Sequence, residues 1–171
     1  MVQDPLTLYK LIVLYMLDRV SFPLTNAQVG DFILEKGYTN FFTLQQAISE
    51  LIDADMLKAK SIRNRTHLEI TEEGKTTLGF FSNRISQQIK DEIDDYFKKN
   101  QFELKNEVSV LSNYYKSTTG EYEANLIIKE KNINLVNITM SVPSEDLAAS
   151  ICEKWENTNQ DIYNHLIEKL F

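Results

Sequence analysis

FTLQQAISELIDADML, at residues 42–57, is the stretch that predicts the fold of the N-terminal half. Its apolar residues recur every three or four positions, with Leu44, Ile48 and Leu51 on one side and glutamines, a serine and acids on the other. This spacing predicts an amphipathic helix over residues 42–54, with one face on a core and the other facing solvent or a partner.

Two shorter helices are predicted upstream of this one. Asp4 is a good helix cap and Pro5 suits the first helical position, and apolar residues then recur at helical spacing to about residue 20. Asn26 is a good cap for a short second helix, which Gly37 ends.

A hairpin is predicted directly after the third helix. Residues 57–62 and 66–71 read as two strands around Arg63-Asn64-Arg65, and Asn64 tolerates the left-handed conformation that a tight turn needs. Three helices followed by a hairpin is the order of a winged helix-turn-helix domain, which we assign to residues 1–80.

A single long helix is predicted over residues 72–100, and its part at 81–100 connects the two halves of the chain. An apolar stripe on it leaves two alternatives open: a seam between two copies in a dimer, or packing on the chain's own C-terminal half. The stripe, and hence the candidate dimer interface, consists of Leu78, Phe81, Ile85, Ile89 and Ile93.

Residues 101–171 are predicted to form a separate β-β-β-α-α domain. Apolar and polar residues alternate in 122–129 and in 136–142, and a further strand precedes them, so a three-stranded antiparallel meander is expected. Two helices, one starting near Ser144 and one near Asn159, are expected to cover it. The predicted fold class is therefore α+β.

Two motifs resemble winged-helix repressors of the MarR and PadR kind. Residues 43–57 resemble their recognition helix and its exit, where Asp55 stands in place of the usual glycine, and ITEEGK at 70–75 resembles the close of their wing. The whole chain is similar to an uncharacterised bacterial family of clostridial type with a domain of unknown function. That similarity rests on Asp4-Pro5-Leu6, Tyr38-Thr39-Asn40-Phe41-Phe42 and the pair Gln45-Gln46.

In a winged helix the third helix enters the major groove and wing cations hold phosphates. Glutamine pairs with adenine edges and serine with several bases, so the base-reading candidates are Gln45, Gln46 and Ser49. The candidates for phosphate contact are Asn40, Thr43, Lys58, Lys60, Arg63 and Arg65. The alternative is an ordinary solvated face, because Glu50 and Asp53 on the same helix would repel phosphates.

The composition restricts the function classes. A net charge of -7 requires any DNA binding to come from a local basic patch. One cysteine, Cys152, fits a reducing cytoplasm, and His67 and His165 lie in no metal-binding motif, so we expect no disulfide and no metal. No nucleotide-binding or nucleophile motif and no membrane-spanning run occurs, so we expect neither an enzyme, a cofactor nor a membrane partner.

We therefore expect a cytoplasmic DNA-binding transcriptional regulator. Its expected partners are double-stranded DNA, a second copy of the chain and a small-molecule or protein effector of the C-terminal domain. The alternative, from a different class, is a winged-helix adaptor that binds another protein through its acidic third helix and apolar stripe without touching DNA.

Overall fold

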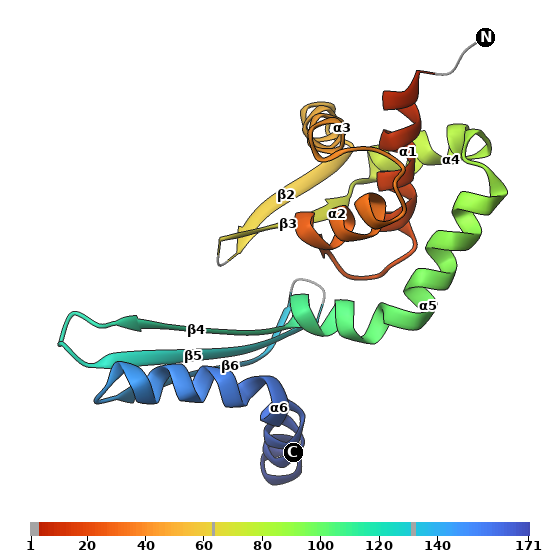
Figure 1. The fold of residues 1–171 in the computed structure, drawn as a ribbon. Helices are drawn as coiled ribbons and strands as arrows, with labels where there is room; N and C mark the ends of the chain where they lie inside the picture. Colours follow the sequence, from red (N-terminus) through yellow and green to blue (C-terminus); the bar gives the residue numbers. More distant parts are fainter. Residues whose placement is uncertain (1–3, 63, 131–132) are drawn as a thin grey trace. The chain divides into compact units, whose positions relative to one another are not determined.

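The computed structural model describes residues 4–62, 64–130 and 133–171, and it is a mixed α and β fold (Figure 1). The described residues form six α-helices and two three-stranded antiparallel sheets. The chain divides into two compact units, Met1–Lys105 and Asn106–Phe171. The α+β prediction is confirmed at this level.

The N-terminal unit begins with three helices, as predicted. Their bounds are α1 Pro5–Asp18, α2 Asn26–Glu35 and α3 Phe41–Asp53. Asp4 caps α1 through a bond from the Leu6 amide, as expected. The cap of α2 is Thr25 rather than the predicted Asn26, because Thr25 and Gln28 satisfy each other's backbone amides in a capping box.

The hairpin follows α3 and lies within a three-stranded sheet of order β1-β3-β2. Its strands are β1 Leu24–Thr25, β2 Leu57–Ile62 and β3 Arg65–Ile70. Asn64 has φ 63°, so the predicted left-handed turn residue is confirmed. The two-residue strand β1 was not predicted, since it is too short to show a sequence period.

The core of this unit is built around α1. Six of its residues are buried, and side chains of α2, α3 and the sheet pack in the same core. The large side chains of this core that are almost fully buried include Phe32, Ile12, Leu14, Met16, Leu24, Ile33, Leu44, Leu51 and Leu68. This packing leaves one side of α3 outside the core.

The prediction of one continuous helix over residues 72–100 is wrong. The structure has α4 Glu72–Phe81, a short 3-10 turn Ser82–Arg84, and α5 Gln87–Ser109. Ile85 between them is extended, with φ -85° and ψ 127°, and the Ser86 hydroxyl accepts the Ile89 amide at the start of α5. Serine side chains compete in this way with the backbone hydrogen bonds of a continuous helix. Ile85, at the break between the two helices, is buried.

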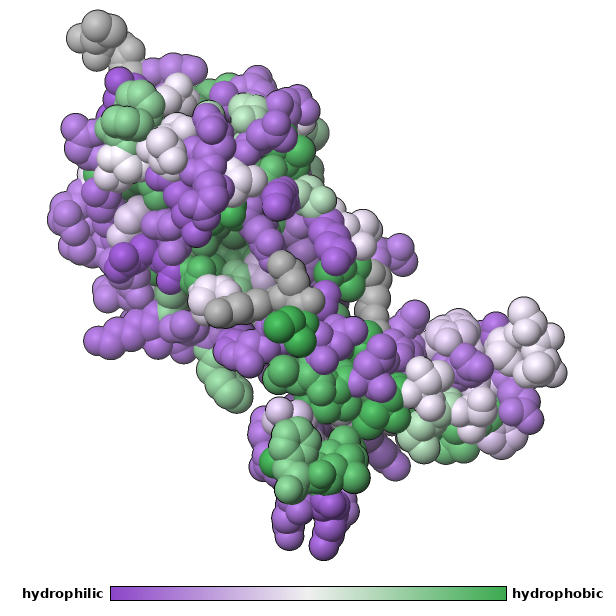
Figure 2. All heavy atoms as spheres, turned by 180° about the vertical axis from the view of Figure 1, so that it is seen from behind, coloured by the Kyte–Doolittle hydropathy of each residue, from purple (hydrophilic) through white to green (hydrophobic). Residues whose placement is uncertain are grey.

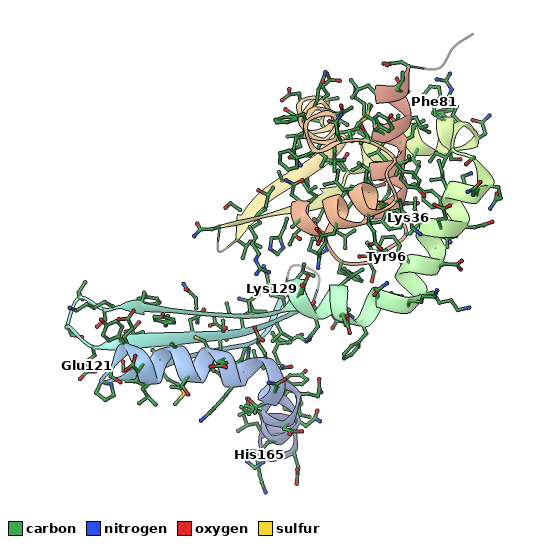
Figure 3. All side chains as sticks on the ribbon, in the orientation of Figure 1. Lys36, Phe81, Tyr96, Glu121, Lys129 and His165 are labelled. Carbon is green, nitrogen blue, oxygen red and sulfur yellow. The ribbon has the colours of Figure 1, made fainter. Side chains whose placement is uncertain are left out.

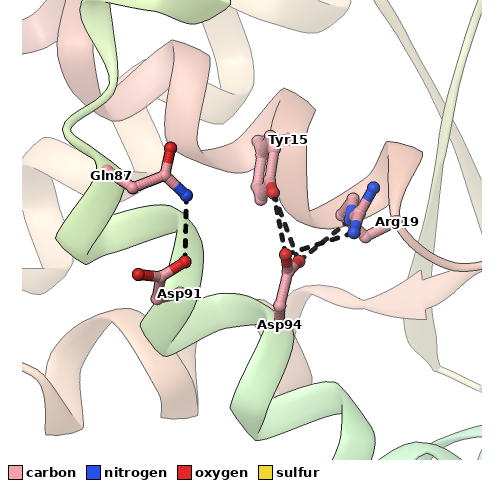
Figure 4. Close-up of polar contacts among 5 residues, drawn as sticks. All are labelled: Tyr15, Arg19, Gln87, Asp91 and Asp94. Carbon is pink, nitrogen blue, oxygen red and sulfur yellow. Dashed lines mark hydrogen bonds and ion pairs between the residues drawn. The ribbon is translucent and has the colours of Figure 1, made fainter.

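α5 is held on α1 by a polar contact (Figure 4). The Asp94 carboxylate accepts the Tyr15 hydroxyl at 3.2 Å and two guanidinium nitrogens of Arg19 at 2.9 and 3.1 Å. Burial, and then the charge of Asp94, raise the pKa of Tyr15. A second contact joins α5 to α2, where the Tyr96 ring lies 4.8 Å from that of Phe32.

The C-terminal unit is the predicted meander covered by helix. Its elements are β4 Val110–Lys116, β5 Tyr122–Glu130, β6 Ile133–Val142 and α6 Glu145–Leu170, and the sheet order is β4-β5-β6. Trp155 of α6 is buried against Leu126 and Val136. Residues 131 and 132, which connect β5 to β6, lie outside the described residues.

The expectation of two C-terminal helices is wrong, because α6 is one helix of 26 residues. Asn159 was expected to begin a new helix, but it is buried and its side chain donates to the carbonyls of Trp155 and Glu156. Thr158 likewise donates to the carbonyl of Lys154. Such bonds favour a bend over a break, and Figure 1 shows α6 changing direction about midway.

Candidate nucleic-acid interface

The outer face of α3 brings the predicted base-reading residues together. Leu44, Ala47, Ile48 and Leu51 are buried on the inner face. On the other side Gln46 and Ser49 are exposed, as the helical spacing predicted. The Ser49 hydroxyl and the Gln46 amide thus lie on the side from which a partner would approach α3, and the Gln46 amide donates to Glu50 of the same helix.

Gln45 differs from its neighbour because its side chain is bonded to another helix, whereas Gln46 bonds to Glu50 of its own helix. Its amide exchanges two hydrogen bonds with the side chain of Asn26, at 3.0 and 3.2 Å. Asn26 is the first residue of α2, so this pair joins the two helices near their outer surface. Sequence reasoning missed it, since 19 positions separate the two residues.

The start of α3 is organised by Asn40. Its side-chain oxygen accepts the backbone amide of Thr43 at 2.9 Å, which caps the helix. This cap uses the side-chain oxygen of Asn40. The amide nitrogen of the same side chain is the group that would donate to a phosphate. Thr43 itself is half-buried.

One acid of α3 is paired with a cation from α1. The Lys10 ammonium lies 2.5 Å from the Glu50 carboxylate, and Gln46 donates to the same carboxylate at 3.2 Å. The bond from Lys10, and then that from Gln46, lower the pKa of Glu50, so it stays charged but locally compensated. Asp53 is exposed at the end of the helix.

The cations of the hairpin share one face. Lys58 and Lys60 occupy alternate positions of β2 and so lie on one face, and the register sets Ile62 of the same face opposite Arg65. All three cations are exposed. The fourth predicted cation, Arg63, lies outside the described residues.

Hydrogen bonds between the segment after α3 and the segment after β3 position the hairpin against α3. Asp55, which follows α3, has φ 58°, and its carbonyl accepts the Thr71 hydroxyl at 2.6 Å. The Thr71 amide donates to the Met56 carbonyl, and its hydroxyl accepts the Gly74 amide at the start of α4. Thr71 of the ITEEGK motif therefore helps to fix the geometry of the surface.

Two exposed aromatic side chains at the start of α3 were missed. Phe41 is 55% exposed and Phe42 83%, and their rings stack edge to face with centroids 5.8 Å apart. The sequence held a signal for Phe42, which does not fit the buried spacing set by Leu44 and Ile48. Phe41 does fit that spacing, three positions before Leu44, so its exposure could not be read from the helical period. An apolar pair on the rim of a polar face fits a protein surface better than a phosphate backbone.

The candidate dimer residues divide into buried and accessible ones. Leu78, Ile85 and Ile93 are buried in the structure, Ile89 is half-buried and Phe81 is exposed beside the Arg84 guanidinium (Figure 3). α5 contacts α1 through Asp94 and α2 through Tyr96. A dimer interface that used all five side chains would require the buried ones to be exposed first.

The two histidines belong to different units and differ in exposure. His67 is buried in β3, whereas His165 is exposed near the end of α6 (Figure 3). Within residues 4–62, 64–130 and 133–171, no group of three or more histidine, cysteine or acidic side chains could hold a metal ion. No helix in that part of the chain has the length and apolar character needed to cross a membrane.

Fold and surface together define a two-unit α+β protein whose N-terminal unit presents a polar helix face beside a cationic hairpin. The chain belongs to the family described as Domain of unknown function (DUF4364), whose model matches residues 9–170. No curated protein and no solved structure is matched by this chain.

Proposed function

We propose that residues 1–80 form a winged helix-turn-helix domain that binds double-stranded DNA, and that the protein is a cytoplasmic transcriptional regulator. The proposal draws on the likeness of its motifs to those of MarR and PadR repressors. The observation that carries it is the outer face of α3, which is exposed and polar while its inner face is buried. An exposed helix next to a hairpin has the arrangement that inserts into a major groove.

In this proposal Gln46 and Ser49 reach the base edges. Glutamine can form two bonds with adenine, and each good pair contributes about 1–3 kcal/mol of discrimination. Gln45 stays on Asn26 and helps to orient α3. Lys58, Lys60 and Arg65 hold phosphates from the exposed face of the hairpin.

Electrostatics decides whether so acidic a protein can bind DNA. The N-terminal unit has 13 lysines and arginines against 15 acids, while residues 106–171 have 5 against 10. The excess acid is thus concentrated in the C-terminal unit, and in α3 the charge of Glu50 is offset by Lys10. Binding then depends on the local cations of the hairpin.

A selection from random duplexes tests the proposal, run at about 50 mM and about 200 mM salt because phosphate-driven affinity falls steeply over that range. We expect enrichment of an inverted repeat with half-sites about 34 Å apart. Absence of enrichment at either salt would remove the proposal.

The hairpin is tested by K58A/K60A. If Lys58, Lys60 and Arg65 each hold one phosphate in both subunits of a dimer, the log–log salt slope is about -5, and the double variant reduces it to about -2. The matched control is K98A/K99A, which removes the same charge from exposed positions of α5. Equal effects of both pairs would mean that only net charge matters.

A second candidate function is favoured by Phe41 and Phe42. Exposed aromatic rings are typical anchors of protein interfaces, so the same domain would serve as an adaptor that binds another protein. Changing both to serine separates the two functions. A DNA-binding protein keeps its selected sequence in this variant, whereas an adaptor has no selected sequence to keep.

A further inference from the structure

The free edge of β6 is a surface that the proposed function does not use. In the part of the chain that the structure describes, β6 is hydrogen-bonded to β5 on one side and to no strand on the other. The register with β5 shifts between Ile128 and Lys129, and beyond it pairing is regular from Val136 to Val142. Along these seven residues, every second backbone N–H and C=O points away from β5 and is not used by the sheet.

The side chains of this edge are unusual for a protein in which 25% of residues are charged. The segment VNITMSV, at 136–142, has neither a charged residue nor a proline. Exposed edge strands are usually protected by such residues, because an open edge pairs with any matching strand. The opposite edge, β4, carries Lys116 at its end.

The helix layer leaves β6 partly uncovered. Met140 and Ala124 are cross-strand partners and so share a face of the sheet, yet Met140 is 46% exposed and Ala124 0%. Ile133 and Leu135 at the start of β6 are exposed as well. Figure 2 shows hydrophobic side chains gathered on the surface of the C-terminal unit.

We propose that a second copy of this chain pairs with β6 in antiparallel fashion, about a two-fold axis at Thr139. Residues 136–142 alternate apolar and polar when read in either direction. This register therefore places apolar side chains opposite apolar ones and polar side chains opposite polar ones. Val136 faces Val142 of the second copy, Ile138 faces its Met140, and Asn137 faces its Ser141. The two sheets become one of six strands, and the two free edges disappear.

The same features argue for a second copy over a foreign peptide. Edge-to-edge pairing gives hydrogen bonds to any strand, and specificity comes from side-chain pairs. This edge offers no charge that would select a charged partner. Its pattern is complementary to itself, which is what a two-fold interface requires.

Sedimentation velocity of the full chain without DNA tests the interface, so the outcome is independent of DNA binding. We expect a dimer at about ten micromolar, and T139K should weaken self-association at least tenfold because two like charges then face each other across the axis. The control is N113K on β4, since Asn113 and Thr139 are both exposed and both pair with Asn125 of β5. This control should remain dimeric.

Charge reversal completes the test. Mixing T139K with T139E should restore dimers that neither variant forms alone, since opposite charges then meet at the axis. Circular dichroism checks that each variant retains its fold. A monomeric wild type, a dimeric T139K, or equal losses in T139K and N113K would each overturn the proposal.

Discussion

At the scale of single residues, close packing explains the glycine at position 74 of the ITEEGK motif. A Cβ atom at this position would lie 2.3 Å from the Met56 carbonyl oxygen and 2.8 Å from the Ile70 side chain. The first of these is a backbone atom and cannot move aside. Glycine is thus required by close packing of α4 against the exit from α3.

Gly79 of the same helix supplies the contrast, because a Cβ atom there meets nothing within 4 Å. We expect G74A to destabilise the fold by about 1–3 kcal/mol, as overpacking does. G79A should stabilise it by about 0.5–1 kcal/mol, since alanine favours helix over glycine. Thermal unfolding of both variants measures this, and a stable G74A would contradict the packing argument.

The sequence was sufficient to predict those properties of single residues that depend only on local structure. The exposure of Gln46 and Ser49 and the positive φ of Asn64 follow from helix spacing and turn chemistry. The Asn26–Gln45 and Lys10–Glu50 pairs could not be predicted, because they depend on how α1, α2 and α3 pack together. Such contacts between distant residues leave no periodic signal in one sequence.

At the scale of elements, two helices were misjudged in opposite directions. The break near Ile85 was missed, while a break near Asn159 was predicted where none exists. In both places short polar side chains bond to the backbone, which either ends a helix or bends it. Burial of Ile85 and of Asn159 decides the outcome, and burial is a tertiary property.

The attachment of α5 to the rest of its unit gives a prediction about pH. The Tyr38 hydroxyl donates to the Glu92 carboxylate, and this bond, followed by one from Gln88, lowers the pKa of Glu92 below its ordinary 4.5. The folded state therefore holds this proton less tightly than the unfolded chain. The stabilisation is complete above about pH 4.5 and is lost as the pH falls through the lowered pKa.

Replacing Glu92 by glutamine should accordingly lower the Tm at pH 7, with the difference from wild type shrinking as the pH falls below 4.5. E103Q, at an exposed position of the same helix, removes the same charge and should leave the Tm nearly unchanged. Melting curves at pH 7 and pH 3 test both variants. A difference between E92Q and wild type that persists undiminished at pH 3 would argue against the bond from Tyr38.

At the scale of the whole molecule, the two proposals meet in the affinity for DNA. The C-terminal unit is acidic, so we expect it to contribute to DNA affinity by pairing two N-terminal units and not by phosphate contacts. A dimer binds the second half-site as an intramolecular event, which raises affinity by about 10²–10⁴ over a single half-site.

T139K should therefore bind an isolated half-site as tightly as wild type but lose the gain on an inverted repeat. K58A/K60A should do the reverse, weakening both sites while leaving the dimer intact, because its lysines lie on β2. Fluorescence anisotropy with one-site and two-site duplexes distinguishes the variants. If T139K keeps the full gain, the β6 edge does not join the DNA-bound copies, and if wild type shows none, one chain binds alone.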